Sequence, residues 1–111
     1  MLEIHSKSYQ KQYNENFICV IPTNIYGPND NYHLKDAHVI PALIHKCYLA
    51  KINNQPFYVW GSGTPLREFI YSEDVANLTR MLLDSEYDGN DPIILSTSEE
   101  ITSSLTVKPI L

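Results

Sequence analysis

The chain has 111 residues, of which 43% are apolar and 19% are charged, so it is long enough for one modest domain or part of a larger one. Its aromatic content of 11% excludes an intrinsically disordered chain, which is typically charge-rich and poor in aromatic residues. The formal net charge is −5 and the Lys and Arg residues form no cluster, which argues against nucleic-acid binding.

Cysteine use and hydropathy predict a soluble, cytoplasmic chain. Cys19 and Cys47 are the only cysteines, and neither takes part in a metal-binding spacing. Both lie in apolar stretches, so we expect them to be small buried hydrophobic residues. No secretion signal precedes the first helical pattern, and no apolar run approaches the roughly 18 residues that span a bilayer. We therefore expect no metal and no membrane contact.

The first third of the chain predicts a helix, a strand and a long loop. Apolar and aromatic residues recur at helical spacing over 1–13, with no capping residue ahead of them, as in a helix that begins further upstream. Residues 17–21 are apolar and partly β-branched, which predicts a strand buried on both faces. The Pro-, Asn- and Asp-rich stretch 22–37 is predicted to be a functional loop.

The middle of the chain predicts a helix over 38–50, strands over 57–60 and 67–71, and a second helix capped by Ser72. Pro41 is compatible with the first of these helices because it falls in the first turn.

The last third adds a turn over 88–92 and a short strand over 93–95, after which no regular pattern is found. Strands that alternate with helices of about a dozen residues indicate an α/β fold.

The first chemically informative segment is PTNIYGP at 22–28, directly after a predicted buried strand. Ligands of α/β sheets sit beyond the carboxyl ends of the strands. Asn24 is therefore a candidate for binding a cofactor or substrate, and Gly27 allows close approach of the backbone. The alternative is an ordinary loop rich in Pro, Asn and Gly.

The second segment begins with Gly61 and Gly63, which resemble the start of a dinucleotide-binding fingerprint. Leu66 occupies the third glycine position, and the segment leads into a predicted strand instead of a helix. It is therefore not a phosphate-binding glycine loop. Trp60 and Arg67 flank it, and an indole with a guanidinium suits a nucleoside diphosphate. The alternative is a core tryptophan and an arginine paired with Glu68 or Asp74.

Among the four histidines, His38 is the candidate acid–base residue. It lies where the long loop meets the start of a predicted helix, which directs its imidazole toward whatever the loop binds.

Three segments together resemble the GDP-L-fucose synthase family of the extended short-chain dehydrogenase/reductase superfamily. They are IPTNIYGPNDNYH at 21–33, HVIPALIHK at 38–46 and VWGSGTPLREFIYSEDVA at 59–76. The resemblance covers residues 1–96 and leaves 97–111 as a divergent or truncated tail. It implies the carboxyl-side part of an NAD(P)-binding Rossmann-like fold, with part of a small substrate domain.

The resemblance also implies an activity, a cofactor and site residues. Enzymes of this family invert C3 and C5 of GDP-4-keto-6-deoxy-D-mannose and reduce C4 with NADPH, and the intact enzyme is a homodimer. By position, His38 matches the general acid of the epimerisation and a contact to NADP(H). The remaining matches are the cofactor contacts Pro22, Thr23, Asn24 and Ile25 and the GDP-sugar contacts Lys46, Trp60 and Arg67.

Two family motifs are not found in these 111 residues, the GxGxxG loop and the catalytic Tyr-x-x-x-Lys pair. The resemblance therefore predicts that the chain alone is inactive. The alternatives are another nucleotide-sugar epimerase or dehydratase of the superfamily, or a non-catalytic isoform that pairs with a full-length subunit. The main reading expects His38, Trp60 and Arg67 to converge on one cleft.

Overall fold

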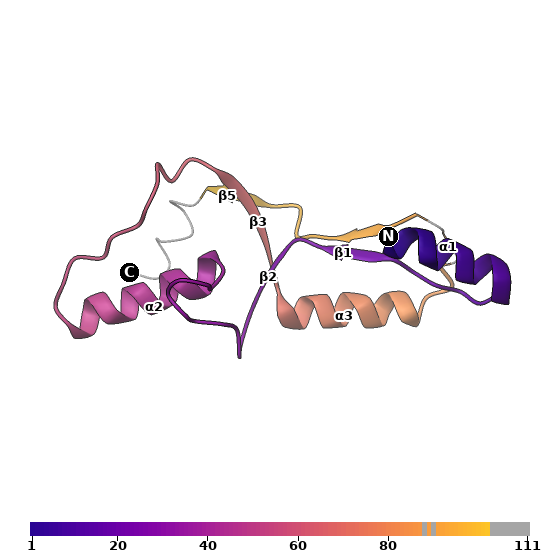
Figure 1. Ribbon diagram of the computed structural model, residues 1–111, viewed down its shortest axis with the longest axis horizontal. Helices are drawn as coiled ribbons and strands as arrows, with labels where there is room; N and C mark the ends of the chain where they lie inside the picture. Colours follow the sequence, from indigo (N-terminus) through magenta and orange to yellow (C-terminus); the bar gives the residue numbers. More distant parts are fainter. Residues whose placement is uncertain (88, 90, 103–111) are drawn as a thin grey trace.

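A computed structural model describes residues 1–87, 89 and 91–102 of the chain. Helices and strands alternate along it, as expected for an α/β fold (Figure 1). In chain order the elements are α1 (Leu2–Tyr13), β1 (Val20–Pro22), β2 (Asn24–Tyr26), α2 (Val39–Ile52), β3 (Leu66–Tyr71), α3 (Ser72–Leu83), β4 (Ile93–Leu95) and β5 (Glu100–Thr102).

The molecule is elongated. Its principal extents are 60 × 25 × 24 Å and its radius of gyration is 18.4 Å, whereas a compact domain of this length has a radius of about 13 Å. Figure 1 shows α1 at one end, α2 at the other, and β2 and β3 between them; β1, β4 and α3 all lie along the stretch between β2 and α1. We call α1, β1 and β4 the α1 half, and α2, α3, β2, β3 and β5 the site half.

The strands form two small sheets. In the α1 half, β1 pairs in parallel with β4, with Ile21 opposite Ile94. In the site half, β3 is central: it pairs in parallel with β2 and antiparallel with β5. Only Thr23 separates β1 from β2, and its N–H donates to the carbonyl of Leu95 at 3.0 Å. The chain thus passes from one sheet directly into the other.

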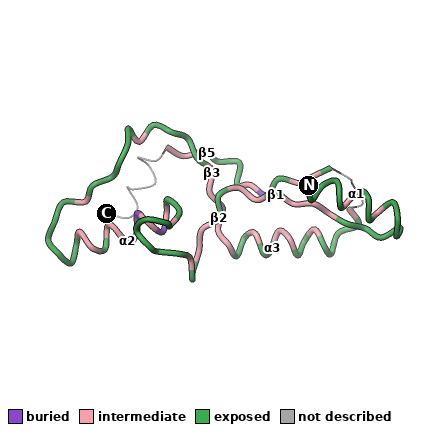
Figure 2. Tube along the Cα trace, in the orientation of Figure 1, coloured by how far each residue is buried: buried purple, intermediate pink, exposed green. Residues whose placement is uncertain are grey.

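The buried core is small. Among the described residues, the buried hydrophobic side chains are Leu43, Ile70 and Leu95, and Pro41 is also fully enclosed (Figure 2). Ile70 is 1% exposed near the end of β3, and α3 packs against β2 and β3. The site half therefore contains most of the core.

The helices follow from local sequence. α1 ends at Asn14, which adopts the left-handed conformation with φ 55° and donates its N–H to the Gln10 carbonyl. Pro41 lies in the first turn of α2, as expected, where its missing N–H costs no hydrogen bond. α3 begins with Glu73 and Asp74, whose negative charges suit a helix N-terminus.

The strand predictions are partly wrong. The strand expected over 17–21 lies at 20–22, and it is not buried on both faces because Ile21 is 50% exposed. Residues 57–60 form no strand. The expected loop 22–37 contains β2, and β5 follows the point where no pattern was found. Each missed strand has three residues and is specified by its partner β3.

Three smaller expectations also need correction or fall outside the described residues. Tyr71 precedes the first residue of α3, so Ser72 is inside the helix instead of capping it. Cys19 and Cys47 are half-buried, not buried. The turn expected over 88–92 includes residues 88 and 90, and most of the expected tail is residues 103–111; these lie outside the described part of the chain.

Candidate functional site

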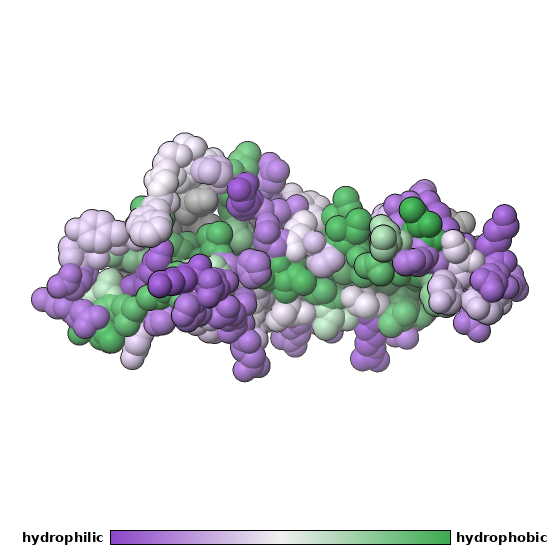
Figure 3. Space-filling model, in the orientation of Figure 1, coloured by the Kyte–Doolittle hydropathy of each residue, from purple (hydrophilic) through white to green (hydrophobic). Residues whose placement is uncertain are grey.

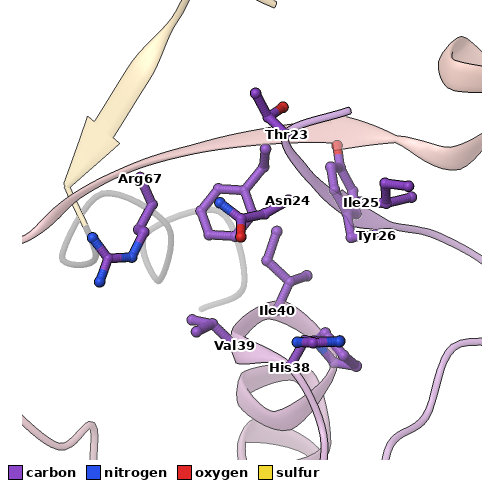
Figure 4. A pocket seen from close by; sticks show the side chains of 10 residues that line it. Thr23, Asn24, Ile25, Tyr26, His38, Val39, Ile40 and Arg67 are labelled. Atoms are coloured by element: carbon purple, nitrogen blue, oxygen red, sulfur yellow. The ribbon is translucent and has the colours of Figure 1, made fainter. Parts of the chain in front are cut away.

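A pocket of about 330 Å³ lies between the strands β2 and β3 and the first turn of α2. Figure 4 shows Asn24 and Arg67 on the strand side and His38, Val39 and Ile40 on the helix side. The lining residues are Thr23, Asn24, Ile25, Tyr26, His38, Val39, Ile40, Pro41, Arg67 and Phe69. We call this the β2–α2 pocket.

Asn24 is held in place by the neighbouring strand. Its side-chain Nδ2 donates to the carbonyl oxygen of Glu68 at 2.7 Å, and its backbone is in register with Phe69. Because β2 is only three residues long, this side-chain bond adds to a small backbone ladder. The amide group of Asn24 is thus fixed at the pocket wall.

The Thr23 hydroxyl is a polar group that the described residues leave unsatisfied. Its Oγ1 is buried and has no hydrogen-bond partner among them, and the residue lines the β2–α2 pocket. A buried hydroxyl without a partner is costly, and native structures usually pair it. The hydroxyl oxygen is itself buried and points away from Arg67 and Ile40 (Figure 4), so Thr23 contributes its backbone and methyl group to the pocket wall more than its hydroxyl.

His38 is at the boundary between loop and helix. It precedes α2 with extended backbone, φ −65° and ψ 169°, and its carbonyl accepts the N–H of Ala42 at 3.0 Å. The imidazole is exposed at the rim of the β2–α2 pocket. This geometry leaves it accessible to a bound molecule, as proton transfer requires.

Arg67 is exposed on β3, on the opposite wall from His38 (Figure 4). Its Nη1 donates to the carbonyl of Leu66 at 2.9 Å. The alternative expectation, a pair with Glu68, is not what forms, because the carboxylate of Glu68 accepts hydrogen bonds from Ser96 and Ser98. The guanidinium gives the pocket a positive group suited to phosphate oxygens.

Sequence reasoning missed the apolar side of this pocket. Tyr26 and Phe69 line it with their rings 6.5 Å apart in an edge-to-face arrangement, and Val39, Ile40 and Pro41 come from α2. The sequence pattern predicts only that Val39 and Ile40 belong to a helix over 38–50. Their position directly after His38 is the signal that points to the pocket. Residues in the first turn of a helix lie close to the residue that precedes the helix, so they can line the same pocket.

A second pocket, of about 560 Å³, contains the other two candidate substrate contacts. The ammonium of Lys46 lies 4.6 Å from the ring centroid of Trp60, a cation–π distance. Trp60 is 85% exposed, so the alternative that it is a core residue is wrong. The pocket is lined by Lys46, Leu49, Ala50, Asn53, Gln55, Pro56, Phe57, Tyr58 and Trp60.

The candidate residues therefore divide between two pockets. Most of the predicted cofactor contacts share the β2–α2 pocket with His38 and Arg67, but Pro22 ends β1 and does not line it. Trp60 lines the second pocket with Lys46. The expectation that His38, Trp60 and Arg67 converge on one cleft is thus wrong for Trp60, because the segment before β3 is not a strand that would align Trp60 with the sheet.

Within the described part of the chain, no three His, Cys, Asp or Glu side chains are arranged to hold a metal ion. None of the helices in that part is both long and apolar enough to cross a membrane.

The characterised proteins that this chain resembles in sequence include several GDP-L-fucose synthases. The chain is 52% identical over 100 residues to a GDP-L-fucose synthase of Dictyostelium discoideum and 40% identical over 97 residues to GDP-L-fucose synthase 1 of Arabidopsis thaliana. These matches use 90% and 86% of the chain. They cover 31% and 30% of the relatives, so the chain spans about a third of their length.

Among solved structures, a GDP-L-fucose synthetase from Naegleria fowleri bound to NADP is 42% identical, with a TM-score of 0.86 over 99% of this chain and 36% of that one. The α/β fold with parallel pairing is therefore the Rossmann-like fold expected for an extended short-chain dehydrogenase/reductase. The model of the NAD dependent epimerase/dehydratase family matches residues 1–96. The chain belongs to that family.

Proposed function

We propose that this chain is part of a GDP-L-fucose synthase, which converts GDP-4-keto-6-deoxy-D-mannose to GDP-L-fucose by 3,5-epimerisation and 4-reduction with NADPH. The observation that carries the proposal is the 52% identity to the Dictyostelium GDP-L-fucose synthase. The grouping of His38 and Arg67 with Thr23 and Asn24 in one pocket supports it independently. We place the chain in the carboxyl-side part of the enzyme's cofactor-binding domain.

The proposed cofactor contacts are Pro22, Thr23, Asn24, Ile25 and His38. The Asn24 side-chain amide and the exposed His38 imidazole fit a cofactor rich in polar groups, and the apolar residues of the pocket fit a flat ring. When bound, NADPH supplies the hydride that reduces C4 of the sugar. Asn24 orients the ligand through an amide that the backbone of Glu68 already holds in place. Pro22 contributes less directly, because it lies outside the pocket lining.

His38 is the proposed general acid of epimerisation. Its position at the start of α2 leaves the imidazole exposed at the pocket rim, free to deliver a proton to a carbon beside the sugar ketone. Val39 and Ile40, from the same turn, line the pocket next to it. This apolar neighbourhood favours keeping bulk water away from the reacting carbon.

The proposed GDP-sugar contacts are Arg67, Lys46 and Trp60. Arg67 presents a guanidinium fork for a phosphate oxygen pair. Lys46 and Trp60 form a separate cation–π pair, which suits a second part of the same extended substrate. Two pockets are consistent with a substrate that has a sugar at one end and a nucleoside at the other.

The fold is also compatible with another nucleotide-sugar epimerase or dehydratase, and with a non-catalytic chain that pairs with a full-length subunit. We favour the GDP-sugar enzyme because the relatives with high identity carry that name. A homodimeric, cytoplasmic enzyme is part of the proposal.

Ligand binding by the 111-residue chain tests the proposal. Trp60 is the only tryptophan, so its fluorescence reports on the second pocket. We expect GDP to change this fluorescence at lower concentration than UDP, and Arg67→Gln to weaken GDP binding roughly tenfold. Arg80→Gln is the matched control, because Arg80 is an exposed arginine on α3. A preference for UDP would contradict the proposal.

The same chain gives a test of the cofactor contacts. We expect His38→Ala to weaken NADP⁺ binding measured by isothermal titration calorimetry, and His5→Ala, a change on the exposed face of α1, to leave it unaltered. Because the chain contains no Tyr-x-x-x-Lys pair, we expect no NADPH consumption with the keto sugar. Turnover by the chain alone would contradict this assignment of roles.

A further inference from the structure

Glu68 is a residue of β3 that the proposed chemistry does not use. It stands between Arg67 and Phe69, both of which line the β2–α2 pocket. Successive side chains of a strand point to opposite faces. Glu68 therefore points away from the pocket, on the face of β3 behind it, and its side chain is half-buried.

The carboxylate of Glu68 binds the turn that joins β4 to β5. One oxygen, Oε1, accepts hydrogen bonds from the hydroxyl of Ser96 and from the backbone N–H of Ser98, the latter at 2.7 Å. Ser98 has a left-handed backbone, with φ 60°. A residue other than glycine keeps this conformation only when its surroundings hold it. The carboxylate thus fixes the shape of a turn 30 residues away in sequence.

The backbone of Glu68 contacts a residue of the pocket wall. Its carbonyl oxygen accepts the Asn24 side-chain amide at 2.7 Å. The next residue, Phe69, lines the pocket, and its carbonyl accepts the Thr97 hydroxyl at 3.4 Å from the same turn. One residue of β3 therefore connects the turn on the back of the sheet to a pocket amide on the front.

We propose that Glu68 is a positioning residue for the β2–α2 pocket. Its carboxylate ties the 96–98 turn to β3, and this attachment holds the strand where its carbonyl fixes Asn24 and its neighbour Arg67 faces the pocket. The effect on ligand affinity rests on the proposed function, whereas the effect on Asn24 does not.

The hydrogen-bond geometry predicts different effects for Glu68→Gln and Glu68→Asp on the attachment of the turn. Both hydrogen bonds from the turn end on the same oxygen, so an amide oxygen at that place can accept them equally well. Glu68→Gln therefore keeps the attachment although it removes the charge. Glu68→Asp keeps the charge, but its side chain is one methylene shorter and withdraws the oxygen from the turn. A role based on charge alone predicts the opposite order.

Nuclear magnetic resonance of the ¹⁵N-labelled chain without ligand tests the proposal. We expect Glu68→Asp to shift the Asn24 side-chain amide signals and to speed hydrogen exchange at the Ser98 amide. Glu68→Gln should preserve both, as should Glu99→Gln, which changes an exposed carboxylate in the same connection. Unchanged Asn24 signals in Glu68→Asp, or altered ones in Glu68→Gln, would overturn the proposal.

A second variant covers the case in which Glu68→Asp does not fold. Ser96→Ala removes a donor from the turn without altering β3, and we expect it to shift the same Asn24 signals. Titration with NADP⁺ then adds the ligand measurement: we expect a loss of roughly tenfold in affinity for Glu68→Asp and less than about twofold for Glu68→Gln. If the unaltered chain binds no NADP⁺, the proposed cofactor role fails and the amide signals still decide the role of Glu68.

Discussion

The two halves of the molecule have similar elements and very different packing. The site half has three paired strands with α3 packed on two of them, and it contains the fully buried Ile70. The α1 half has two paired strands and one of the buried side chains, Leu95 on β4; α1 has no buried residue, and neither has α3. Figure 3 shows apolar residues at the surface over β1 and the neighbouring part of α1, and also over α2 and the middle of the molecule, so both halves expose apolar side chains.

The difference follows from what a parallel sheet requires. Parallel strands are normally covered on both faces, and their sequences are apolar for that reason. Ile21 and Ile94 lie opposite each other in the β1–β4 pair, yet they are 50% and 67% exposed. Apolar sequence alone thus does not produce a core, because a core also needs a neighbouring layer. The two halves provide matched positions at which this idea can be tested.

The largest effect should come from truncating the central strand of the site half. Ile70→Ala removes a side chain that is 1% exposed, and we expect it to lower the free energy of unfolding by roughly 2–5 kcal/mol. Ile94→Ala makes the same change at a position 67% exposed and should cost much less. Chemical denaturation followed by circular dichroism compares the two. Equal losses would remove the distinction between the halves.

The second-largest loss of stability should come from adding a side chain at Gly27, which directly follows β2. A Cβ added at Gly27 would lie 2.1 Å from Oγ and 2.9 Å from Cβ of Ser72. We expect Gly27→Ala to destabilise the site half by roughly 1–3 kcal/mol.

Adding Ser72→Ala to the Gly27→Ala variant should recover part of the lost stability. The second change removes the Ser72 hydroxyl, which makes the closer of the two contacts. Thermal denaturation of the single and double variants measures the coupling. Strictly additive losses would show that the contact with Ser72 is not the cause.

A smaller effect is expected on the exposed β1–β4 pair. Ile94→Thr keeps a β-branched residue and should change the free energy of unfolding by less than about 0.5 kcal/mol. It should nevertheless reduce self-association at high concentration, because uncovered strands with apolar faces promote it. Sedimentation velocity measures this. Met81→Gln, at a position 66% exposed on α3, is the control, and an equal reduction there would contradict a special role for the strand pair.

The smallest effect is expected in α1. Lys7 Nζ lies 2.7 Å from Glu3 Oε1, and this hydrogen bond holds the pKa of Glu3 below its ordinary value and the pKa of Lys7 above its own. The pair therefore stabilises the helix at neutral pH. Its contribution disappears as the pH falls through the lowered pKa of Glu3, and again as the pH rises through the raised pKa of Lys7.

Circular dichroism of the wild-type chain should show a slight loss of helix in acid that Glu3→Gln no longer shows. Glu15→Gln, which lies outside α1, should behave like the wild type. Both groups are exposed, so the difference should be small.

The fold was predictable where the pattern is local. The three helices and the strand 67–71 follow from the periodicity and Pro placement of their own residues, and they occur within one or two residues of the expected bounds. The short strands β2 and β5 were not predictable in this way. Asn24–Tyr26 reads as part of a loop and becomes a strand only because β3 supplies its partner, which no local window contains.

The sequence identified most of the residues of the site but not how all of them are arranged. Thr23, Asn24, Ile25, His38 and Arg67 do line one pocket. Thr23 and Asn24 follow the carboxyl end of β1, as the sequence predicts, whereas Arg67 lies near the amino end of β3 and reaches the pocket because β3 pairs with β2. The place of Trp60 was wrong because residues 57–60 were expected to be a strand. Without strand pairing this segment instead runs beside α2, where Lys46 contacts the indole.

The direct junction between β3 and α3 joins a strand of the pocket to a helix without a loop. The strand ends at Tyr71 and the helix begins at Ser72, so no linker residue separates them. Such a junction has no hinge at which the strand can shift independently. Arg67, which lines the pocket, lies on this strand, and only four residues separate it from the first residue of α3. We expect a single glycine inserted between Tyr71 and Ser72 to give the strand and the helix a flexible joint, which the direct junction does not provide.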